Sequence, residues 1–295
     1  MRQLGFWLPD TEAAARVVNV AEIPQRSPFR YPGGKTWLVP HIRKWLRSLK
    51  ERPSTFIEPF VGGGIVSLTV AFEDLAEKVL MVELDENVAA VWTTMLSEDN
   101  DWLAERVASF ELTVESARAE TSRVPRTTKE LAFQTLLRNR IYHGGILAPG
   151  GGVLKYGENG KGIRSRWYPE TLRKRIQNIK VVREKVTFCQ GDGIETIAKH
   201  AGRRTAVFFI DPPYTAAGKR AGSRLYTHYK LDHENLFKQC GKIRGDFLMT
   251  YDTADEVVAM AKTHGFCVKT VSMMNTHHST MQELLIGRNL SWVED

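Results

Sequence analysis

The sequence has few cysteines and no long apolar run, and each shortage excludes a class of protein. Only three of its 295 residues are cysteines, and they are too widely spaced for a disulfide framework or a zinc site. The most apolar uncharged stretch, residues 59–72, is shorter than the roughly 18 apolar residues of a membrane helix. Asp10 and Glu12 interrupt the N-terminus before a signal-peptide core could form. We therefore expect a cytoplasmic protein without a metal site or a membrane span.

Positive charge is concentrated in one part of the chain. The composition, 42% hydrophobic and 25% charged, is that of a globular protein. Residues 121–180 contain 13 Lys or Arg against three acidic residues, a local charge of +10 in a chain whose total is +7. Such a concentration favours a polyanionic partner, because neutralised phosphates release counterions. A solvated basic face without a partner is the alternative.

Apolar runs of strand length alternate with helical patterns. Helices are expected at 65–72, from about residue 88 to 95, and at 129–142. The expected strands are 54–57, 78–82, 186–189, 206–210 and 247–250, with a closing hairpin made by 267–271 and 283–286. This alternation predicts a parallel, doubly wound α/β sheet.

A basic, glycine-rich region interrupts this alternation. Residues 144–162 hold eight glycines, and a loop of this kind is uncommon in a compact domain unless it has a function. We interpret residues 97–183 as an inserted lobe. The remaining divisions are an N-terminal extension, 1–26, and a catalytic domain made of 27–96 and 184–295.

Two glycine motifs come close to known phosphate-binding loops. Gly33-Gly34-Lys35-Thr36 ends as a P-loop does, but Phe29 stands where its first glycine is needed. Gly62-Gly63-Gly64 follows a strand and opens a helix, and Glu83 ends the next strand, where a carboxylate can accept hydrogen bonds from a ribose. This spacing indicates an adenosine site without a pyrophosphate; a tight turn alone would also explain the glycines.

Four motifs, in this order, resemble those of the D12 class of DNA N6-adenine methyltransferases, the Dam-like group. They are FRYPGGK at 29–35, FIEPFVGGG at 56–64, Asn139-Arg140 at the start of the insertion, and DPPY at 211–214 with a terminal Glu283-Leu284-Leu285. The resemblance spans roughly residues 27–287. It implies a Rossmann-like sheet that uses S-adenosylmethionine, with the insertion as a target-recognition lobe.

The resemblance also implies a set of cofactor-binding residues. Tyr31 and Lys35 would line the methionine part, with the Lys35 ammonium near its carboxylate, although the family often has Trp in place of Tyr31. Glu83 would hold the ribose hydroxyls and Asp192 would read the adenine of the cofactor. The full set is Tyr31, Gly34, Lys35, Glu58, Pro59, Phe60, Gly62, Gly64, Glu83, Asp192 and Asp211.

The chemistry of adenine methylation explains why the DPPY residues suit the reaction. The lone pair of the adenine N6 is delocalised into the ring, so two acceptors are needed to draw this nitrogen towards a tetrahedral geometry. The Asp211 carboxylate and the Pro212 carbonyl would each accept one N6–H hydrogen bond. Pro213 stiffens the turn, and Tyr214 would stack on a base that has left the duplex. No metal is required by this scheme.

The nucleic-acid contacts are expected in the insertion and after DPPY. Base-reading or phosphate-binding roles are predicted for Asn139, Arg140, Tyr142, His143, Lys155, Arg164, Arg166, Lys219, Arg220 and Arg224. The predicted partner is duplex DNA, in the cytoplasm or nucleoid of a bacterium or its phage. The enzyme would be a monomer or weak dimer, either solitary or paired with a restriction endonuclease. An RNA adenine methyltransferase and a non-catalytic nucleic-acid-binding module are the alternative functions.

Overall fold

A computed structural model describes residues 22–31, 33–148, 151–154, 157, 160–213, 228, 230–274 and 280–293. Its centre is a seven-stranded sheet in the order β3-β2-β1-β4-β5-β7-β6. The strands are β1 (Thr55–Glu58), β2 (Lys78–Glu83), β3 (Val186–Gln190), β4 (Ala206–Ile210), β5 (Asp246–Asp252), β6 (Cys267–Met274) and β7 (Thr280–Gly287). The first five are parallel, and β7 runs antiparallel to both β5 and β6. The predicted parallel sheet and closing hairpin are confirmed.

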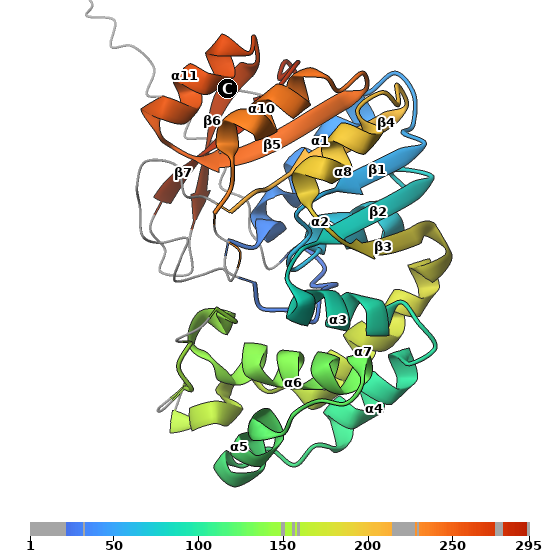
Figure 1. Ribbon diagram of the computed structural model, residues 1–295, viewed down its shortest axis with the longest axis vertical. Coiled ribbons are helices and arrows are strands. Elements are labelled where there is room, and N and C mark those ends of the chain that lie inside the picture. The colour runs from blue at the N-terminus through green and yellow to red at the C-terminus, as the bar shows by residue number, and fades with distance from the viewer. Residues whose placement is uncertain are drawn as a thin grey trace, which may run out of the picture.

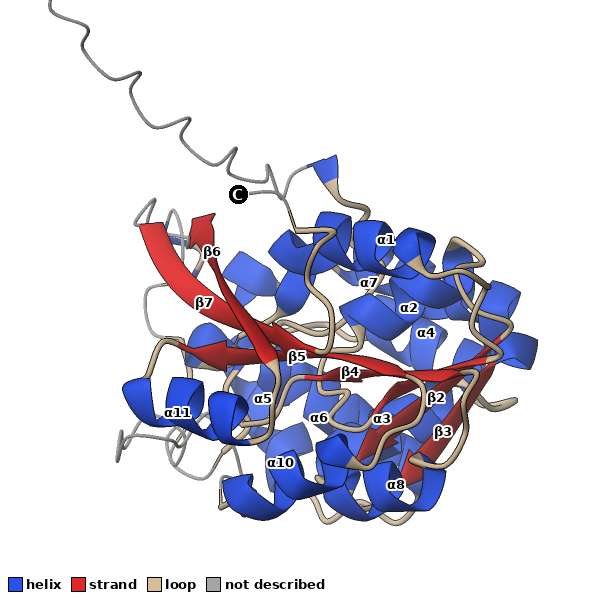
Figure 2. Ribbon diagram, turned by 90° about the horizontal axis from the view of Figure 1, so that it is seen from above, coloured by secondary structure: helices blue, strands red, loops and turns tan. Residues whose placement is uncertain are grey.

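Helices cover both faces of the sheet, because successive residues of a buried strand point to opposite sides. In β4, Val207 and Phe209 join one apolar cluster, whereas Phe208 and Ile210 join another. On the first face lie η2 (Lys35–Leu38), α1 (Val39–Ser48), α2 (Ile65–Phe72) and α3 (Glu86–Met95), and on the second lie α8 (Gly193–His200), α10 (His233–Gly241) and α11 (Asp255–Thr263). Figure 2 shows the sheet between these layers.

The predicted insertion is helical and lies between α3 and β3 in the chain. It comprises α4 (Asn100–Ser109), α5 (Val114–Ser122), α6 (Thr128–Ile141), η3 (His143–Gly145), η5 (Gly162–Arg166), α7 (Pro169–Asn178) and η6 (Ile179–Lys185). In Figure 1 these helices lie below the sheet, with α6 packed against α3. Leu136 of α6 and Val91 of α3 belong to the same buried cluster, so the insertion shares its core with the sheet domain.

The helix termini follow ordinary capping chemistry. The Asp85 carboxylate accepts hydrogen bonds from the N–H groups of Asn87 and Val88 at the start of α3, and Thr127 caps α6 through Glu130 N–H.

Among the described residues, none of the helices combines the length and the apolar character that a membrane span requires.

Candidate active site

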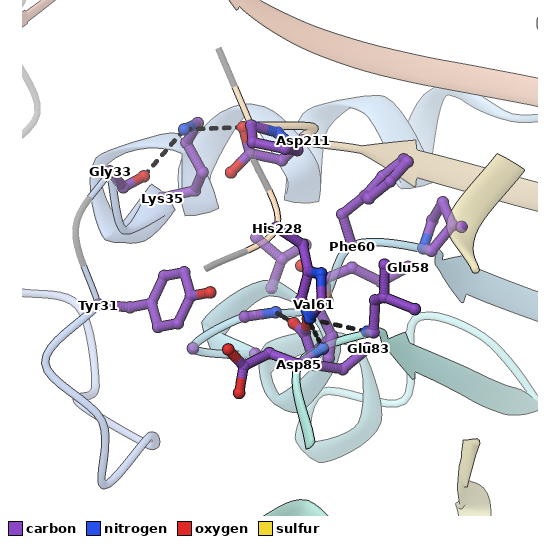
Figure 3. Close-up of a pocket in the computed structure, with 18 of the residues that line it drawn as sticks. Tyr31, Gly33, Lys35, Glu58, Phe60, Val61, Glu83, Asp85, Asp211 and His228 are labelled. Atoms are coloured by element: carbon purple, nitrogen blue, oxygen red, sulfur yellow. Dashed lines mark hydrogen bonds and ion pairs between the residues drawn. The ribbon is translucent and has the colours of Figure 1, made fainter. Parts of the chain in front are cut away.

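A pocket opens where the chain reverses its direction across the sheet. The chain builds outward from β1 to β2 and β3, then returns to β4 on the other side of β1. Ligands of open α/β sheets bind beyond the carboxyl ends of the strands at such a point. The pocket lining is Tyr31, Gly33, Gly34, Lys35, Glu58 to Val66, Glu83 to Asp85, Asp192, Gly193, Asp211, Pro213, His228, Lys230 and Leu231. Figure 3 shows these side chains converging from separate elements.

The glycine loop after β1 is shaped by two aromatic rings. Gly62 and Gly64 have φ of 45° and 63°, in the left-handed region that favours glycine. A Cβ on Gly62 would lie 2.5 Å from the Tyr31 ring, and one on Gly64 would lie 2.4 Å from the Trp92 ring. Trp92 also donates an indole hydrogen bond to Gly62 O at 2.9 Å. A side chain at either position would therefore overlap one of these rings, so the loop requires glycine there.

Glu83 fixes the loop and keeps capacity for one more donor. Its Oε1 accepts from the N–H groups of Leu84 and Asp85, and its Oε2 accepts from Gly62 N–H at 2.9 Å. A carboxylate offers about four lone-pair sites, so Oε2 retains one for a ligand hydroxyl. Burial raises the pKa of the Glu83 carboxyl to about 7. By contrast, one Asp85 oxygen caps α3.

Glu58 is a buried carboxyl on the floor of the pocket. Its side chain is 3% exposed, and its Oε2 accepts from Ser67 N–H at 2.9 Å at the start of α2. Burial, with a smaller contribution from the nearby Asp211 carboxylate, raises the pKa of the Glu58 carboxyl to about 8. A cationic ligand in the pocket would favour the ionised form of this group.

The Lys35 ammonium is directed at Asp211 and not towards the glycine loop. It lies 2.9 Å from Asp211 Oδ1 and 3.2 Å from Glu283 Oε1, and it donates to Gly33 O at 2.8 Å. These contacts use all three donors of an ammonium. The expectation that Lys35 lies near the carboxylate of the cofactor stays a prediction, and the structure shows this ammonium beside Asp211.

Asp211 is held from two sides. Thr250 of β5 donates its hydroxyl hydrogen bond to Asp211 Oδ1 at 2.8 Å, and Lys35 contacts the same oxygen. Both neighbours come from elements distant in sequence, so the sheet itself sets the direction of the carboxylate. Pro212 and Pro213 follow at once, and Tyr214 lies outside the described residues.

Asp192 and Phe60 form the opposite wall. Asp192 caps α8 through Glu195 N–H at 2.9 Å, and no described residue donates to its Oδ2. Phe60 packs against Gly193, where a Cβ would lie 2.6 Å from the ring and 2.5 Å from Pro59 O. The predicted cofactor residues Pro59, Phe60 and Asp192 are thus brought together with Glu58 and Glu83.

Several residues of the site have no signal in the sequence. Thr250 and Trp92 lie within ordinary apolar patterns, and Glu283 was noted only as part of a terminal motif. His228, Lys230 and Leu231 also line the pocket, although they follow DPPY by many residues. These three residues lie between β4 and α10 in the chain, and no local sequence pattern predicts that they reach the pocket.

Two of the predicted DNA-reading residues lie in the interior. Asn139 is fully buried: its Oδ1 accepts from Arg30 N–H, and its Nδ2 donates to the carbonyls of Arg30 and Gly145. Arg140 is 4% exposed and donates to Pro28 O. The structure therefore assigns both side chains to holding the loop before η2, and we no longer expect either to reach a base.

The other predicted contacts lie nearer the surface or outside the described residues. Tyr142 is half-buried and pairs through its backbone with Val153, and His143 is exposed. His143 and Arg164 line a second hollow, together with Lys161. Arg166 is half-buried. Lys155, Lys219, Arg220 and Arg224 lie outside the residues that the structure describes.

A family model matches one part of the chain. Residues 31–120 match the model of the D12 class N6 adenine-specific DNA methyltransferase family. This stretch, less than half of the chain, is therefore similar to a D12 class adenine methyltransferase domain. This is an enzyme family, and the matched residues include the glycine loop, Glu58, Glu83 and Lys35 of the pocket. No curated protein matches the chain at a significant level.

Two of the solved structures that match the chain are similar to it at low identity. A proposed RNA methyltransferase from Pyrococcus horikoshii is 11% identical with a TM-score of 0.40, over 88% of this chain and 84% of its own. The rRNA methyltransferase AviRa from Streptomyces viridochromogenes is 14% identical with a TM-score of 0.39, over 88% and 86%.

Proposed function

We propose that the protein transfers the methyl group of S-adenosylmethionine to the N6 atom of an adenine that has left a DNA duplex. The observation that carries this proposal is the position of Asp211. Its carboxylate follows β4, lines the same pocket as the glycine loop and Glu83, and is held by Lys35 and Thr250. A D12 class domain with this arrangement has an acceptor where the reacting nitrogen would lie.

The residues of the pocket fit S-adenosylmethionine. Gly62 and Gly64 let the loop that lines the pocket pass close to the Tyr31 and Trp92 rings, and Glu83 Oε2 retains a lone pair for a ribose hydroxyl. The Asp192 carboxylate would accept from the adenine amino group. Glu58 would ionise more readily close to a ligand that carries an ammonium and a sulfonium. When bound, S-adenosylmethionine supplies an activated methyl group.

The protein's own task is to orient the nucleophile. Asp211 and the Pro212 carbonyl would accept the two N6–H hydrogen bonds, so that the nitrogen lone pair faces the methyl donor. Because Pro212 and Pro213 have fixed φ and no N–H groups, the turn keeps its carbonyl directed outward. After transfer, N6 loses one proton to solvent. Tyr214, just beyond the described residues, would stack on the base.

Target recognition is proposed for the surface of the insertion. His143, Lys161 and Arg164 line one hollow beside the glycine-rich loop, and this basic lining suits contact with DNA. Arg166 is a further candidate. Lys155, Lys219, Arg220 and Arg224 keep the phosphate-binding roles that the sequence predicts. A solitary enzyme and the partner of a restriction endonuclease are both consistent with this role.

Methyl transfer to defined substrates tests the proposal. Purified protein with radiolabelled S-adenosylmethionine should label duplex DNA, and digestion to nucleosides should give N6-methyladenine. Asp211→Asn should reduce the rate by at least about 10² to 10³, because a charged, preorganised acceptor is replaced by a neutral amide that also presents N–H donors. Asp255→Asn, at an exposed carboxylate in α11, is the matched control.

The same assay separates the alternative functions. Labelling of structured RNA in preference to duplex DNA would replace the proposal with an RNA methyltransferase. Binding of DNA without any binding of S-adenosylmethionine would support a non-catalytic module. Full activity in a folded Asp211→Asn protein would refute the assigned role of this carboxylate.

A further inference from the structure

Several arginines gather where the loop before η2 meets the insertion. Arg175 of α7 donates to Ser27 O at 3.1 Å, and Arg140 of α6 donates to Pro28 O. Arg30 follows two residues later in the same loop, and its backbone is held by Asn139. The guanidinium groups of Arg140 and Arg175 therefore contact one short segment, residues 27–30, which itself carries Arg30. We call Arg30, Arg140 and Arg175 the arginine cluster.

The cluster differs from the other arginines of the insertion in having little opposing charge. Four others each lie 2.8 to 3.0 Å from a carboxylate, namely Arg106, Arg123, Arg173 and Arg183. Among the described residues, Arg30, Arg140 and Arg175 form no ion pair with Asp or Glu. The positive charge of the insertion is thus neutralised along its outer helices and left uncompensated at this junction.

Burial makes the uncompensated charge costly. Arg140 is 4% exposed, and its Nε is buried without a hydrogen-bond partner. Burial and the charges of Arg175, Arg30 and Arg166 lower the pKa of the Arg140 guanidinium to about 9. Burial and Arg166 likewise lower the pKa of the Arg30 guanidinium. Like charges held together in this way destabilise the fold unless an anion joins them.

The cluster adjoins the reaction site. Arg30 immediately precedes Tyr31, whose ring lies against Gly62 and Gly63 at the pocket. Tyr168, which is 47% exposed, interacts electrostatically with Arg30 and Arg140, and its hydroxyl donates to Ser165 O at 2.8 Å. If a base occupies the pocket, an anion bound at the cluster would be part of the same ligand molecule.

We propose that the arginine cluster binds one phosphate of the DNA backbone near the displaced adenine. Arg30 and Arg175 contribute half-buried guanidinium groups, and the buried Arg140 adds its charge. A planar guanidinium can donate two parallel hydrogen bonds to the oxygens of a phosphate. The carbonyl partners of Arg140 and Arg175 leave some of these donors unused. This inference rests on the proposed function, because it takes DNA as the source of the phosphate.

Substitution at Arg175 separates charge from structure. Arg175→Gln can still donate a hydrogen bond to Ser27 O but loses the charge, whereas Arg175→Lys keeps the charge. Arg173→Gln, on the same helix and paired with Glu105 and Glu170, is the matched control. Binding to a random-sequence duplex is measured by fluorescence anisotropy over a range of NaCl concentrations.

The loss of one phosphate contact changes both the affinity for DNA and its dependence on salt concentration. Arg175→Gln should weaken binding about tenfold and reduce the slope of log K against log salt by about 0.9. Arg175→Lys should keep the slope of the wild type, and Arg173→Gln should leave binding and slope unchanged. Equal slopes for Arg175→Gln and the wild type would overturn the inference. If Arg175→Gln does not fold, Arg30→Gln replaces it, because no described residue accepts a hydrogen bond from that side chain.

Inorganic phosphate gives a second readout that needs no DNA. At constant ionic strength, phosphate should raise the Tm of the wild type more than chloride does, and Arg30→Gln should abolish the difference. No difference in the wild type would count against an anion site. A protein that methylates DNA but shows neither effect would refute the cluster alone. A protein that shows both effects but methylates no DNA would refute the proposed function and leave an anion site.

Discussion

Replacing Lys35 with Gln distinguishes two roles for this residue. If the ammonium bound the methionine carboxylate of the cofactor, the substitution would weaken S-adenosylmethionine binding. The structure predicts a different result, because all three donors of the ammonium meet Asp211, Glu283 and Gly33. We expect kcat to fall while the Kd of S-adenosylmethionine changes little.

The magnitude follows from the contacts that are lost. A hydrogen bond to a charged group contributes about 1.5 to 3 kcal/mol, and each 1.36 kcal/mol is tenfold in rate. A loss confined to the reacting complex therefore lowers kcat about 10- to 150-fold. The Asp211 and Glu283 carboxylates would also face each other without a cation, so one must turn away or take up a proton. Removing one partner of a buried pair costs stability of about 3 to 5 kcal/mol.

The double variant Lys35→Gln/Glu283→Gln separates positioning from stability. It removes the unpaired Glu283 charge, so it should recover much of the Tm lost in Lys35→Gln without recovering kcat. Lys50→Gln, at an exposed position after α1, is the control. Calorimetry gives the Kd, single-turnover transfer of labelled methyl gives the rate, and thermal unfolding gives the Tm. A large rise in Kd with normal single-turnover rate would restore the cofactor-carboxylate role and refute the positioning role.

Three further predictions concern the pocket. Glu83→Gln places an amide N–H₂ against backbone N–H donors and should weaken S-adenosylmethionine binding at least about tenfold by calorimetry. Asp85→Ala removes the cap of α3, so it should cost about 1 kcal/mol of stability and affect binding little. The reverse pattern would transfer the ribose role to Asp85. Gly64→Ala should destabilise the protein by about 2 to 5 kcal/mol in urea unfolding, because of positive φ and the Trp92 contact, and Gly202→Ala, with open space around it, should not. Since the folded pKa of Glu58 is about 8 against 4.5, the folded protein holds a proton that the unfolded chain releases, so stability should fall as the pH rises from about 4.5 to 8. Glu58→Gln should flatten this decline in urea titrations, and an unchanged slope would contradict the assignment.

The fold could be predicted from sequence because its signals are local. The run Ala206–Ile210 is uniformly apolar and buried on both faces, and β4 has these same bounds. The stretch Ile65–Phe72 follows three glycines and becomes α2 with unchanged limits. Strand edges elsewhere moved by one to three residues, since pairing with a neighbour extends a strand beyond its apolar core. The proposed division of the chain at 97 and 183 stays a prediction, and the shared apolar cluster links its two parts.

Residues that line the pocket could be predicted from the sequence, but the contacts between their side chains could not. The motifs identified Glu58, Glu83, Asp192 and Asp211 because each follows a strand, and parallel strands end at one edge of the sheet. No such rule predicts which residue of an antiparallel strand reaches the pocket. Glu283 reaches the site only because β7 pairs with β5, which places it opposite Asp252. The contacts of Lys35 depend on this partner, so the sequence alone did not predict that its ammonium lies beside Asp211 and Glu283.

The two buried residues at the end of α6 show why a motif can be correct and its interpretation wrong. Asn139 and Arg140 are polar and lie at the start of the basic, glycine-rich region, which favours a surface role. Yet a buried loop needs partners for its backbone, and Asn139 supplies both a donor and an acceptor to Arg30. The same contact fixes the residue before Tyr31, whose ring shapes the glycine loop. Asn139→Leu should therefore impair S-adenosylmethionine binding and folding together, whereas a base-reading residue would change the preferred DNA sequence and leave cofactor affinity intact.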